Sequence, residues 1–364
     1  MTSTGAVRLG ELLSRLVITV AVPVPLRTSP EGTTSVQWIE RHWYRLSALS
    51  IALLPLSLVF LVVVMVRRLL YRTRIVASEA LPIPVIVVGN IAVGGTGKTP
   101  TVLWLTDVLL DAGYHPGIIT RGYGGNERIQ AVTSQTDTAI GGDEPVLLAQ
   151  RSGCPVWTGG DRVAAARVLL AQHREVDVLI SDDGLQHYRL KRDIEIAVVD
   201  GERGFGNGLL LPAGPLREPT GRLRSVDAVV VNGTTRLTLP RRHDMRLEGR
   251  TFVNLLNPLL QSTPDAFRGK VLHAVAGIGN PTRFFAHLTA LDLSFTAHPF
   301  TDHHRFSPAD LYFPDADAVL MTEKDAVRCA VIARENFWCL PVAAKVDSAL
   351  ADLILDRLKT RHGR

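Results

Sequence analysis

The segment from Val85 to Pro100 carries the residues with the clearest chemical role. It consists of an apolar, β-branched run, a glycine-rich turn and a Lys-Thr pair that opens a helical pattern, VIVVGNIAVGGTGKTP. A strand, a loop and a helix in this order form the setting of a phosphate-binding P-loop. Backbone N–H groups and the helix N-terminus can bind phosphate oxygens, the lysine can neutralise the β- and γ-phosphates, and the threonine hydroxyl can ligate Mg²⁺. We expect the nucleotide-binding loop to comprise Ala92, Val93, Gly94, Gly95, Thr96, Gly97, Lys98 and Thr99.

This loop departs from the strict P-loop pattern at Ala92, where the pattern has glycine. Alanine is the smallest alternative, and glycines follow it at positions 94, 95 and 97. The departure therefore does not remove the predicted nucleotide site.

A second apolar run, residues 176–180, ends in the acidic pair Asp182 and Asp183. An apolar strand that ends in Asp is typical of a Walker B site, where the carboxylate holds a metal ion directly or through water. The alternative is a helix N-cap or an ordinary turn, because Asp-Gly is a turn former. Two adjacent carboxylates cost free energy unless a cation or a donor compensates them. Beside a P-loop, the pair therefore favours a Mg²⁺ site.

The elements that position these residues alternate between short apolar strands and helical stretches, which predicts parallel sheets. We expect residues 194–200 and 226–232 to continue the sheet of the P-loop. Residues 270–276 begin another strand–turn–helix unit. The predicted domains are a P-loop domain (76–232), a polar, irregular linker (233–255) and a second α/β domain (256–364), with the last helix able to pack on either domain.

An uncharged stretch of 20 residues, Ser47–Val66, precedes the P-loop. Its length suffices to cross a hydrocarbon core of roughly 30 Å. Four arginines follow it and two precede it, namely Arg67, Arg68, Arg72 and Arg74 against Arg41 and Arg45. This excess predicts that the downstream chain is cytoplasmic. The alternative is a buried core helix, and Pro55 is expected to weaken the centre of the helix slightly. We expect residues 36–75 to anchor the chain in a membrane, and we assign no role to residues 1–35.

Composition excludes several classes of protein. With 46% hydrophobic and 21% charged residues among 364, the chain is neither a disordered chain nor a coiled coil. Its three widely spaced cysteines predict no disulfide framework and no metal site, as expected in a reducing compartment. The net charge of +5 suits an anionic surface or substrate and is too small to indicate nucleic acid.

Further motifs follow the P-loop in a fixed order: RGYGG (121–125), GDEP (142–145), DDGLQH (182–187), PAGPLRE (212–218), DHH (302–304) and TEKD (322–325). Together with GGTGKTP, they closely resemble the tetraacyldisaccharide 4′-kinases, the lipid A kinases of Gram-negative bacteria. The resemblance runs from about Val36 to about Asp325, and this family tolerates a residue other than glycine at the Ala92 position.

The resemblance implies two α/β/α domains, the first with a P-loop NTPase-like parallel sheet, joined by a short β linker and preceded by a membrane helix. It implies transfer of the γ-phosphoryl group of ATP, with Mg²⁺, to the 4′-hydroxyl of a tetraacylated glucosamine disaccharide 1-phosphate, which gives the lipid IVA precursor of lipid A. The implied partners are this membrane glycolipid and the inner membrane, with the catalytic domains on the cytoplasmic side. No nucleic acid and no obligate protein partner are expected.

The resemblance also implies roles for individual residues. Asp143 is the expected base, with His303 as its charge partner, although spacing does not separate His303 from His304. The alternative for Asp143 is a turn-capping residue before Pro145. The expected catalytic residues are Asp143, His303 and Lys98; the metal ligands are Thr99, Asp182, Asp183 and Glu218; the substrate-binding residues are Arg121, Tyr123, Gln186, His187 and Arg217. Thr322–Asp325 is expected either near the adenine or in a solvated loop.

A different class of protein also contains a P-loop near a membrane segment. A membrane-tethered nucleotide switch, resembling partitioning-type ATPases, would hydrolyse ATP without transferring phosphate to lipid. That interpretation leaves PAGPLRE, GDEP and DHH unexplained. A non-catalytic binding protein is disfavoured because Lys98, Thr99, Asp143 and Asp182 are all present.

Overall fold

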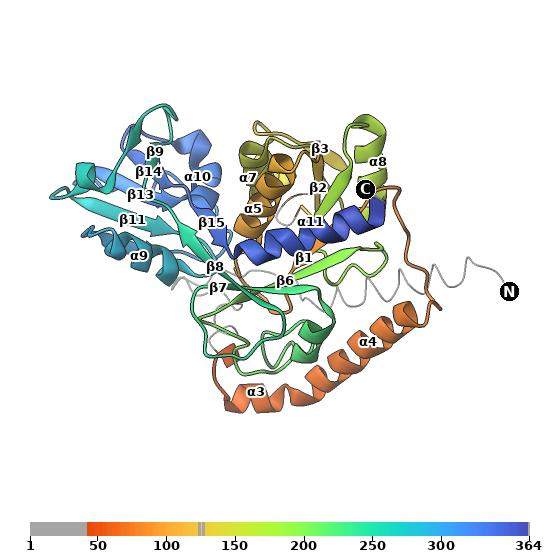
Figure 1. Ribbon diagram of the computed structural model, residues 1–364. Coiled ribbons are helices and arrows are strands. Elements are labelled where there is room, and N and C mark those ends of the chain that lie inside the picture. Colours follow the sequence, from red (N-terminus) through yellow and green to blue (C-terminus); the bar gives the residue numbers. More distant parts are fainter. Residues whose placement is uncertain (1–41, 123–124, 126–127, 363–364) are drawn as a thin grey trace.

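The computed structural model describes residues 42–122, 125 and 128–362, so the predicted extension 1–35 lies outside the described residues. Within them the strands form two sheets, one of nine strands and one of six. Helices cover both faces of each sheet, which gives two α/β/α domains side by side (Figure 1).

The first sheet has the order β15-β8-β7-β6-β1-β5-β2-β4-β3. Its strands are β1 Val85–Gly89, β2 Pro116–Thr120, β3 Gln130–Val132, β4 Val156–Thr158, β5 Val178–Asp182, β6 Ile194–Asp200, β7 Ala228–Asn232, β8 Arg242–Glu248 and β15 Ala343–Val346. Pairing is parallel from β8 to β4 and antiparallel at the edges β3 and β15. The central strands are apolar and buried along their whole length, as expected for a parallel sheet covered on both faces. As predicted, β6 and β7 continue the sheet of the P-loop strand β1.

Helices pack on both faces of this sheet. They are α5 Lys98–Asp111, α6 Thr138–Gly141, α7 Asp143–Ser152, α8 Arg162–Gln172 and α11 Ser348–His362. The apolar side chains of α8 join one core with Ile119 and Leu179. Those of α5, α7 and α11 join the other core with Ile118 and Ile180. Neighbouring strand residues thus enter opposite cores, because successive side chains alternate across the sheet.

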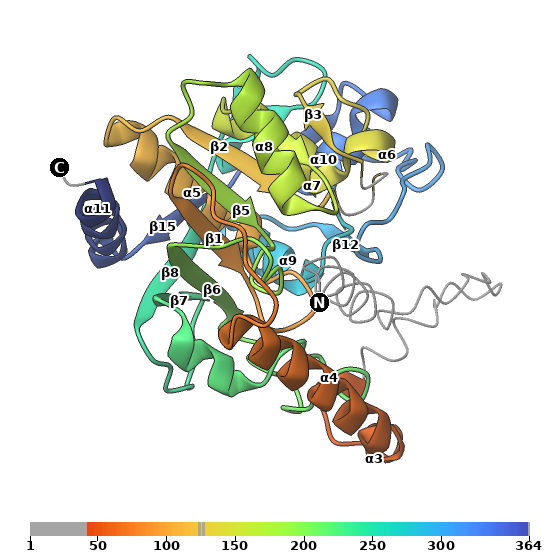
Figure 2. The same cartoon turned by 90° about the vertical axis from the view of Figure 1, so that its right-hand side faces the viewer.

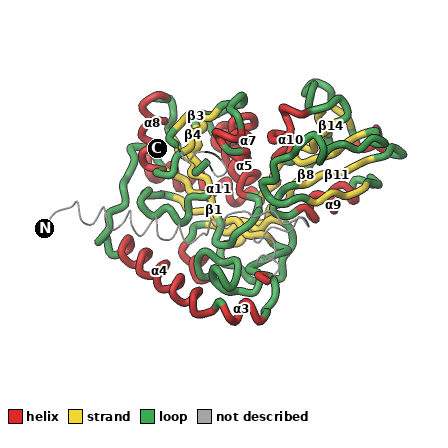
Figure 3. The backbone as a smooth tube through the Cα atoms, turned by 180° about the vertical axis from the view of Figure 1, so that it is seen from behind, coloured by secondary structure: helices red, strands yellow, loops and turns green. Residues whose placement is uncertain are grey.

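The second sheet has the order β10-β9-β14-β13-β11-β12. Its elements are β9 Phe252–Asn254, β10 Gln261–Ser262, β11 Leu272–Ala276, β12 Thr296–Pro299, β13 Ala318–Thr322, β14 Phe337–Leu340, α9 Pro281–Ala290 and α10 Glu323–Cys329; short 3₁₀ helices are η1 Thr220–Ser225, η2 Pro264–Phe267 and η3 Ala330–Ile332. Phe284 and Leu288 of α9 pack on one face of the sheet, and Cys329 of α10 joins the core on the other. Seen from behind, α7 of the first domain lies next to α10 of the second (Figure 3).

The segment 233–255 differs from the irregular linker that we expected. Two strands lie within it: β8 pairs parallel with β7 in the first sheet, and β9 belongs to the second sheet. Along β8 only Met245 is buried, between charged residues that face outward, so the apolar signal of a strand is weak. The chain returns to the first domain at its end, where β15 pairs with β8 and α11 covers the first sheet.

The apolar stretch before the P-loop forms two helices, α3 Ala48–Ala52 and α4 Leu54–Arg72, rather than one (Figure 2). Pro55 lies in the first turn of α4, where its missing N–H costs nothing, so it starts this helix. Among the described residues, α4 is the one helix that is long and apolar enough to cross a membrane, by length and composition alone.

One side of α4 packs on the first domain, and the other side is exposed. Ser57 Oγ donates a hydrogen bond of 2.9 Å to Leu210 O, and Phe60 and Val64 are buried beside it. The exposed side carries Leu58, Val59, Val62, Met65, Val66 and Leu69. Arg67, which we expected among arginines outside the span, turns inward and donates from Nη2 to Gln186 O at 2.8 Å. A buried arginine needs such acceptors, and the hydropathy pattern does not reveal them.

We predict that Ile354→Ala in α11 lowers the free energy of unfolding by about 2–5 kcal/mol, because it removes a fully buried side chain from the core of the first domain. Chemical denaturation followed by circular dichroism measures the change. Asp352→Ala on the exposed side of the same helix is the matched control and should have little effect. Equal effects of the two substitutions would contradict the packing of α11 on the sheet.

Candidate active site between the two domains

A cavity of about 1410 Å³ lies between the two domains and contains most of the predicted site residues. The predicted residues that line it are Val93, Gly94, Gly95, Thr96, Gly97, Lys98, Thr99, Arg121, Asp183, Gln186, His187, Arg217, Glu218 and His303. Ala92, Asp143 and Asp182 are buried and do not line it, and Tyr123 lies outside the described residues. Trp43, Phe60 and Val64 form an apolar part of its wall.

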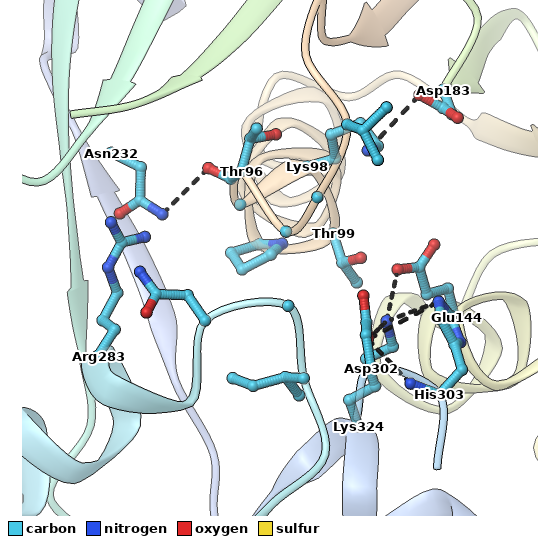
Figure 4. Close-up of a pocket in the computed structure, with 18 of the residues that line it drawn as sticks. Thr96, Lys98, Thr99, Glu144, Asp183, Asn232, Arg283, Asp302, His303 and Lys324 are labelled. Atoms are coloured by element: carbon cyan, nitrogen blue, oxygen red, sulfur yellow. Dashed lines mark hydrogen bonds and ion pairs between the residues drawn. The ribbon is translucent and has the colours of Figure 1, made fainter. Parts of the chain in front are cut away.

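The P-loop runs from the end of β1 to the first turn of α5, as the sequence predicts. Asn90 Nδ2 donates to Thr96 Oγ1 at 3.2 Å, and Asn232 Nδ2 of β7 donates to Thr96 O at 3.2 Å (Figure 4). Gly97 has a φ of 102°, and a Cβ there would lie 2.5 Å from Asn232 Nδ2. Only glycine fits at this position. Because glycine adopts a positive φ without steric cost, the backbone can turn here and Lys98 can begin the helix.

Ala92 lies where the loop pairs with the PAGPLRE segment. Ala92 and Leu216 form an isolated antiparallel bridge, with Val93 N bonded to Pro215 O at 2.9 Å and Arg217 N to Ile91 O at 2.7 Å. The Ala92 side chain packs in the core of the first domain. The structure thus gives Ala92 an extended, buried position, in which glycine is not required.

The two adjacent acids at the end of β5 differ in their environments. Asp183 accepts from Arg217 Nη1 at 3.1 and 3.2 Å, and its Oδ1 lies 3.5 Å from Lys98 Nζ. Burial opposes its ionisation, but Arg217 and Lys98 outweigh burial and hold the pKa of Asp183 well below its usual value. In contrast, burial, Glu144 and Asp183 raise the pKa of Asp182 to about 7.

The environment of Asp182 fits a cation. Its Oδ2 accepts from Thr120 Oγ1 at 3.2 Å, while the buried Oδ1 has no hydrogen-bond partner among the described residues. A buried carboxylate oxygen without a donor is costly unless positive charge compensates it. Carboxylate and hydroxyl oxygens are the ligands that Mg²⁺ prefers. However, the predicted ligands do not converge, since no group of three or more metal-ligating acids, histidines or cysteines occurs in the described part of the chain.

Glu218, a predicted metal ligand, is held by other protein groups. Gln186 Nε2 donates to Glu218 Oε2 at 3.1 Å and to Asn90 O at 3.0 Å, and Tyr188 OH donates to Glu218 Oε1. Burial and Glu218 raise the pKa of Tyr188 above its usual value, so the phenol stays protonated. Arg67 of α4 binds the carbonyl of Gln186 in the same cluster. Tyr188 was not predicted as a site residue, although it directly follows the DDGLQH motif.

Asp143 and His303 come together across the domain boundary. Asp143 is the first residue of α7, and its Oδ2 lies 3.0 Å from His303 Nδ1. His304 Nε2 lies 3.3 Å from Asp310 Oδ2, and its ring contacts Phe300 in a tilted arrangement and Phe306 edge-on, so the structure pairs Asp143 with His303 and not with His304.

Cations of the second domain surround this pair. Lys324 Nζ lies 2.9 Å from Glu144 Oε1, 3.3 Å from Asp302 Oδ1 and 3.4 Å from His303 Nε2 (Figure 4). Arg328 Nε donates to Asp143 Oδ2 at 2.7 Å. Burial opposes ionisation of Asp143, but His303, Lys324 and Arg328 outweigh it and hold the pKa of Asp143 well below its usual value.

The TEKD segment is not a solvated loop. Thr322 caps α10 by accepting from Asp325 N, and Asp325 is fully buried. Lys324 therefore faces the Asp143–His303 pair. Neither this contact nor Arg328 was predicted. Arg328 lies about one helical turn after Asp325 in α10 and belongs to no motif.

His187 lies in the loop that follows β5 and lines the cavity. Burial and the surrounding arginines, with Arg162 first, lower its pKa to about 2. The imidazole is therefore neutral at physiological pH and can form hydrogen bonds without adding charge.

Known proteins resemble this chain over most of its length. The family model of tetraacyldisaccharide-1-P 4′-kinase (LpxK) matches residues 49–359. A tetraacyldisaccharide 4′-kinase of Methylobacillus flagellatus is 50% identical over 328 residues, which cover 90% of this chain and 97% of that protein. The same enzyme of Azoarcus sp. is 50% identical over 328 residues, which cover 89% and 95%.

A solved structure shares the fold. The crystal structure of the "apo" form of LpxK from Aquifex aeolicus in complex with ATP has a TM-score of 0.72 and 28% sequence identity, and the match covers 85% of this chain and 99% of that chain. The predicted fold class is thereby confirmed. Since the family model and these half-identical relatives span nearly the whole chain, it belongs to the tetraacyldisaccharide 4′-kinase family.

Proposed function

We propose that this chain transfers the γ-phosphoryl group of ATP to the 4′-hydroxyl of a tetraacyldisaccharide 1-phosphate. The observation that carries this proposal is the shared cavity, which the P-loop, the cationic side chains and the apolar helix α4 all line. A P-loop fits the triphosphate, and apolar side chains beside it fit an acylated acceptor. A switch that hydrolyses ATP with water has no use for the apolar wall.

The P-loop and the end of β5 with the loop after it, residues 182–187, bind the nucleotide phosphates and their metal ion. Backbone N–H groups of residues 94–98 and the N-terminus of α5 bind phosphate oxygens, and Lys98 neutralises part of their charge. Thr99, Asp182 and Asp183 are the groups that would hold Mg²⁺. When bound, Mg²⁺ supplies positive charge to the β- and γ-phosphates. Glu218 acts through Gln186: it accepts a hydrogen bond from Gln186 Nε2 and so helps to orient the Gln186 side-chain amide.

In the transfer step, the 4′-oxygen attacks the γ-phosphorus and forms an O–P bond. The bond from the γ-phosphorus to the β,γ-bridging oxygen breaks, and ADP leaves with its electron pair. The hydroxyl proton passes to the Asp143–His303 pair. Because His303 lines the cavity and Asp143 lies buried, the proton reaches the pair through His303, and the Asp143 carboxylate stabilises the resulting charge.

The remaining polar residues that line the cavity are proposed to bind the phosphorylated sugar, and its apolar residues to bind the acyl chains. Arg121, Gln186, His187 and Arg217 offer polar contacts to the phosphorylated sugar, and Tyr123 is proposed with them from its place in the same motif as Arg121. Arginine suits phosphate oxygens because its planar fork binds two of them. The acyl chains lie against Trp43, Phe60 and Val64.

The exposed face of α4 holds the enzyme at the inner membrane, with both catalytic domains on the cytoplasmic side. Confinement to the plane of a lipid substrate raises its effective concentration. The basic residues at the end of α4 suit an anionic lipid surface.

We predict that Lys98→Ala lowers turnover by at least about 10²-fold, because one electrostatic contact to the transferring group is lost. Transfer of labelled phosphate from ATP to tetraacyldisaccharide 1-phosphate, followed by lipid extraction, measures the effect. The exposed Lys191→Ala is the matched control for loss of a positive charge. Lys98 would have no essential role if the variant kept nearly full activity.

We predict that Asp143→Asn lowers kcat by about 10²–10⁴-fold, because the amide cannot stabilise a proton on the pair. The KM for Mg-ATP should change little, since Asp143 does not touch the P-loop. His303→Ala should impair the same step, and the double variant should lose less than the product of the two single effects.

His304→Ala is the matched control, because His304 pairs with Asp310 instead of Asp143. If excess Mg²⁺ restored turnover to Asp143→Asn, Asp143 would be a metal ligand and not part of the proton acceptor.

We predict that replacing Leu58 and Val62 together by lysine releases the protein from membranes, because charges on the apolar face of α4 are costly in lipid. The two side chains are 60% and 59% exposed, so replacing them leaves the core of the first domain intact. Membrane fractionation in high salt measures the effect. Asp352→Asn with Asp356→Asn on α11 adds the same charge and should leave the protein membrane-bound. Retention of the lysine variant on membranes would exclude α4 as the anchor.

A further inference from the structure

Arg328 of α10 contacts both domains through one guanidinium group. On the side of the first domain, its Nε and Nη2 both donate to Asp143 Oδ2, the former at 2.7 Å. On the side of the second domain, its Nη1 donates to Asp325 Oδ1 at 2.9 Å and to Gly277 O at 2.7 Å. The Arg328 side chain is 7% exposed, so these contacts replace nearly all of its hydration.

The second-domain contacts of Arg328 extend to the P-loop. Asp325 also accepts from Gly277 N, so Arg328 and Asp325 together fix the start of the loop 277–280. Gly279 in this loop touches Gly95 of the P-loop, and a Cβ at Gly279 would lie 2.6 Å from Gly95 N. One arginine therefore links Asp143 to the loop that packs against the nucleotide-binding backbone.

We propose that Arg328 is a positioning residue for phosphoryl transfer, which keeps the Asp143 carboxylate ionised and fixed against His303 while the two domains are in contact. The inference rests on the proposed role of the Asp143–His303 pair. A planar fork suits this task, since it binds one carboxylate and still has a further N–H for the other domain.

The charges around Asp143 determine the sign of the pH effect. His303, Lys324 and Arg328 face it from the second domain, and Glu144 lies next to it on α7. The acids Asp302 and Asp325 of the second domain contact Lys324 and Arg328, respectively. A cation close to the pair favours its deprotonated form and lowers its pKa. Removing the charge of Arg328 raises the pKa of the pair, so the pair becomes protonated, and activity is lost, at a higher pH.

The test is the pH profile of kcat/KM for Arg328→Gln. We expect the acidic limb to move upward by about one to three pH units and kcat to fall by up to about 10²-fold because the pair is misplaced. The KM for Mg-ATP should change little. Arg328→Lys keeps the charge, so its acidic limb should stay near that of the wild type even though the fork is lost.

A neighbouring ion pair provides the matched control. Arg151 of α7 pairs with Glu323 of α10, so it joins the same two helices without touching Asp143. Arg151→Gln should leave the acidic limb in place. If Arg328→Gln did not move the limb, or Arg151→Gln moved it equally, the inference would be overturned, because Arg328 would then act only by joining the domains.

Two further outcomes complete the test. Wild-type turnover in Asp143→Asn would reject the proposed role of the pair itself, whereas an impaired Asp143→Asn with an unmoved limb in Arg328→Gln would reject only the role of Arg328. If Arg328→Gln does not fold, the double variant Arg328→Gln with Asp143→Asn removes both charges of the Arg328–Asp143 ion pair. Recovery of the folded protein would support the pairing, and failure to recover would overturn it.

Discussion

The carboxylate of Asp143 is buried on one domain, and the cations that compensate it belong to the other. A buried carboxylate without partners would cost several kcal/mol, so its ionised form requires the second domain to be in contact. His303, Lys324 and Arg328 all meet this requirement from the loop after β12 and from α10. Alignment of the domains and the charge state of the proposed proton acceptor therefore depend on the same contacts. Arg283 of α9, which pairs with Asp200 at 2.7 Å, closes the interface on the other side of the P-loop.

A second chain of contacts joins the apolar helix to the nucleotide site. Arg67 of α4 binds Gln186 O, Gln186 binds Asn90 O and Glu218, and Asn90 binds Thr96 in the P-loop. Each link is a hydrogen bond between buried or half-buried groups, and such groups are costly to leave unpaired. The packing of α4 on the first domain thus supports the loop that carries Asp183. The apolar helix α4 and the P-loop form one connected structure.

Local patterns predicted the parts of the site that are local in sequence. The P-loop and the acidic end of β5 each consist of a strand followed by a short loop, so periodicity and turn chemistry suffice. The sequence does not reveal that Arg328 meets Asp143, because 185 positions separate them and only the packing of α10 on α7 joins them. Similarly, the inward turn of Arg67 depends on acceptors in a distant loop. β8 was missed because only Met245 along it is buried.

The two acids after β5 show why adjacent identical residues differ in role. Asp183 already faces Lys98 and Arg217, so further positive charge stabilises it less. Asp182 is more deeply buried, has an oxygen without a donor among the described residues, and faces the negative charges of Glu144 and Asp183. A nearby positive charge therefore stabilises the ionised carboxylate of Asp182 more than that of Asp183, because at Asp182 it offsets both burial and repulsion. Glu144 is itself bound by Lys324 of the second domain, so contact between the domains weakens the repulsion that Asp182 experiences. The second domain thereby influences the carboxylate pair at the end of β5 as well as the proposed proton acceptor.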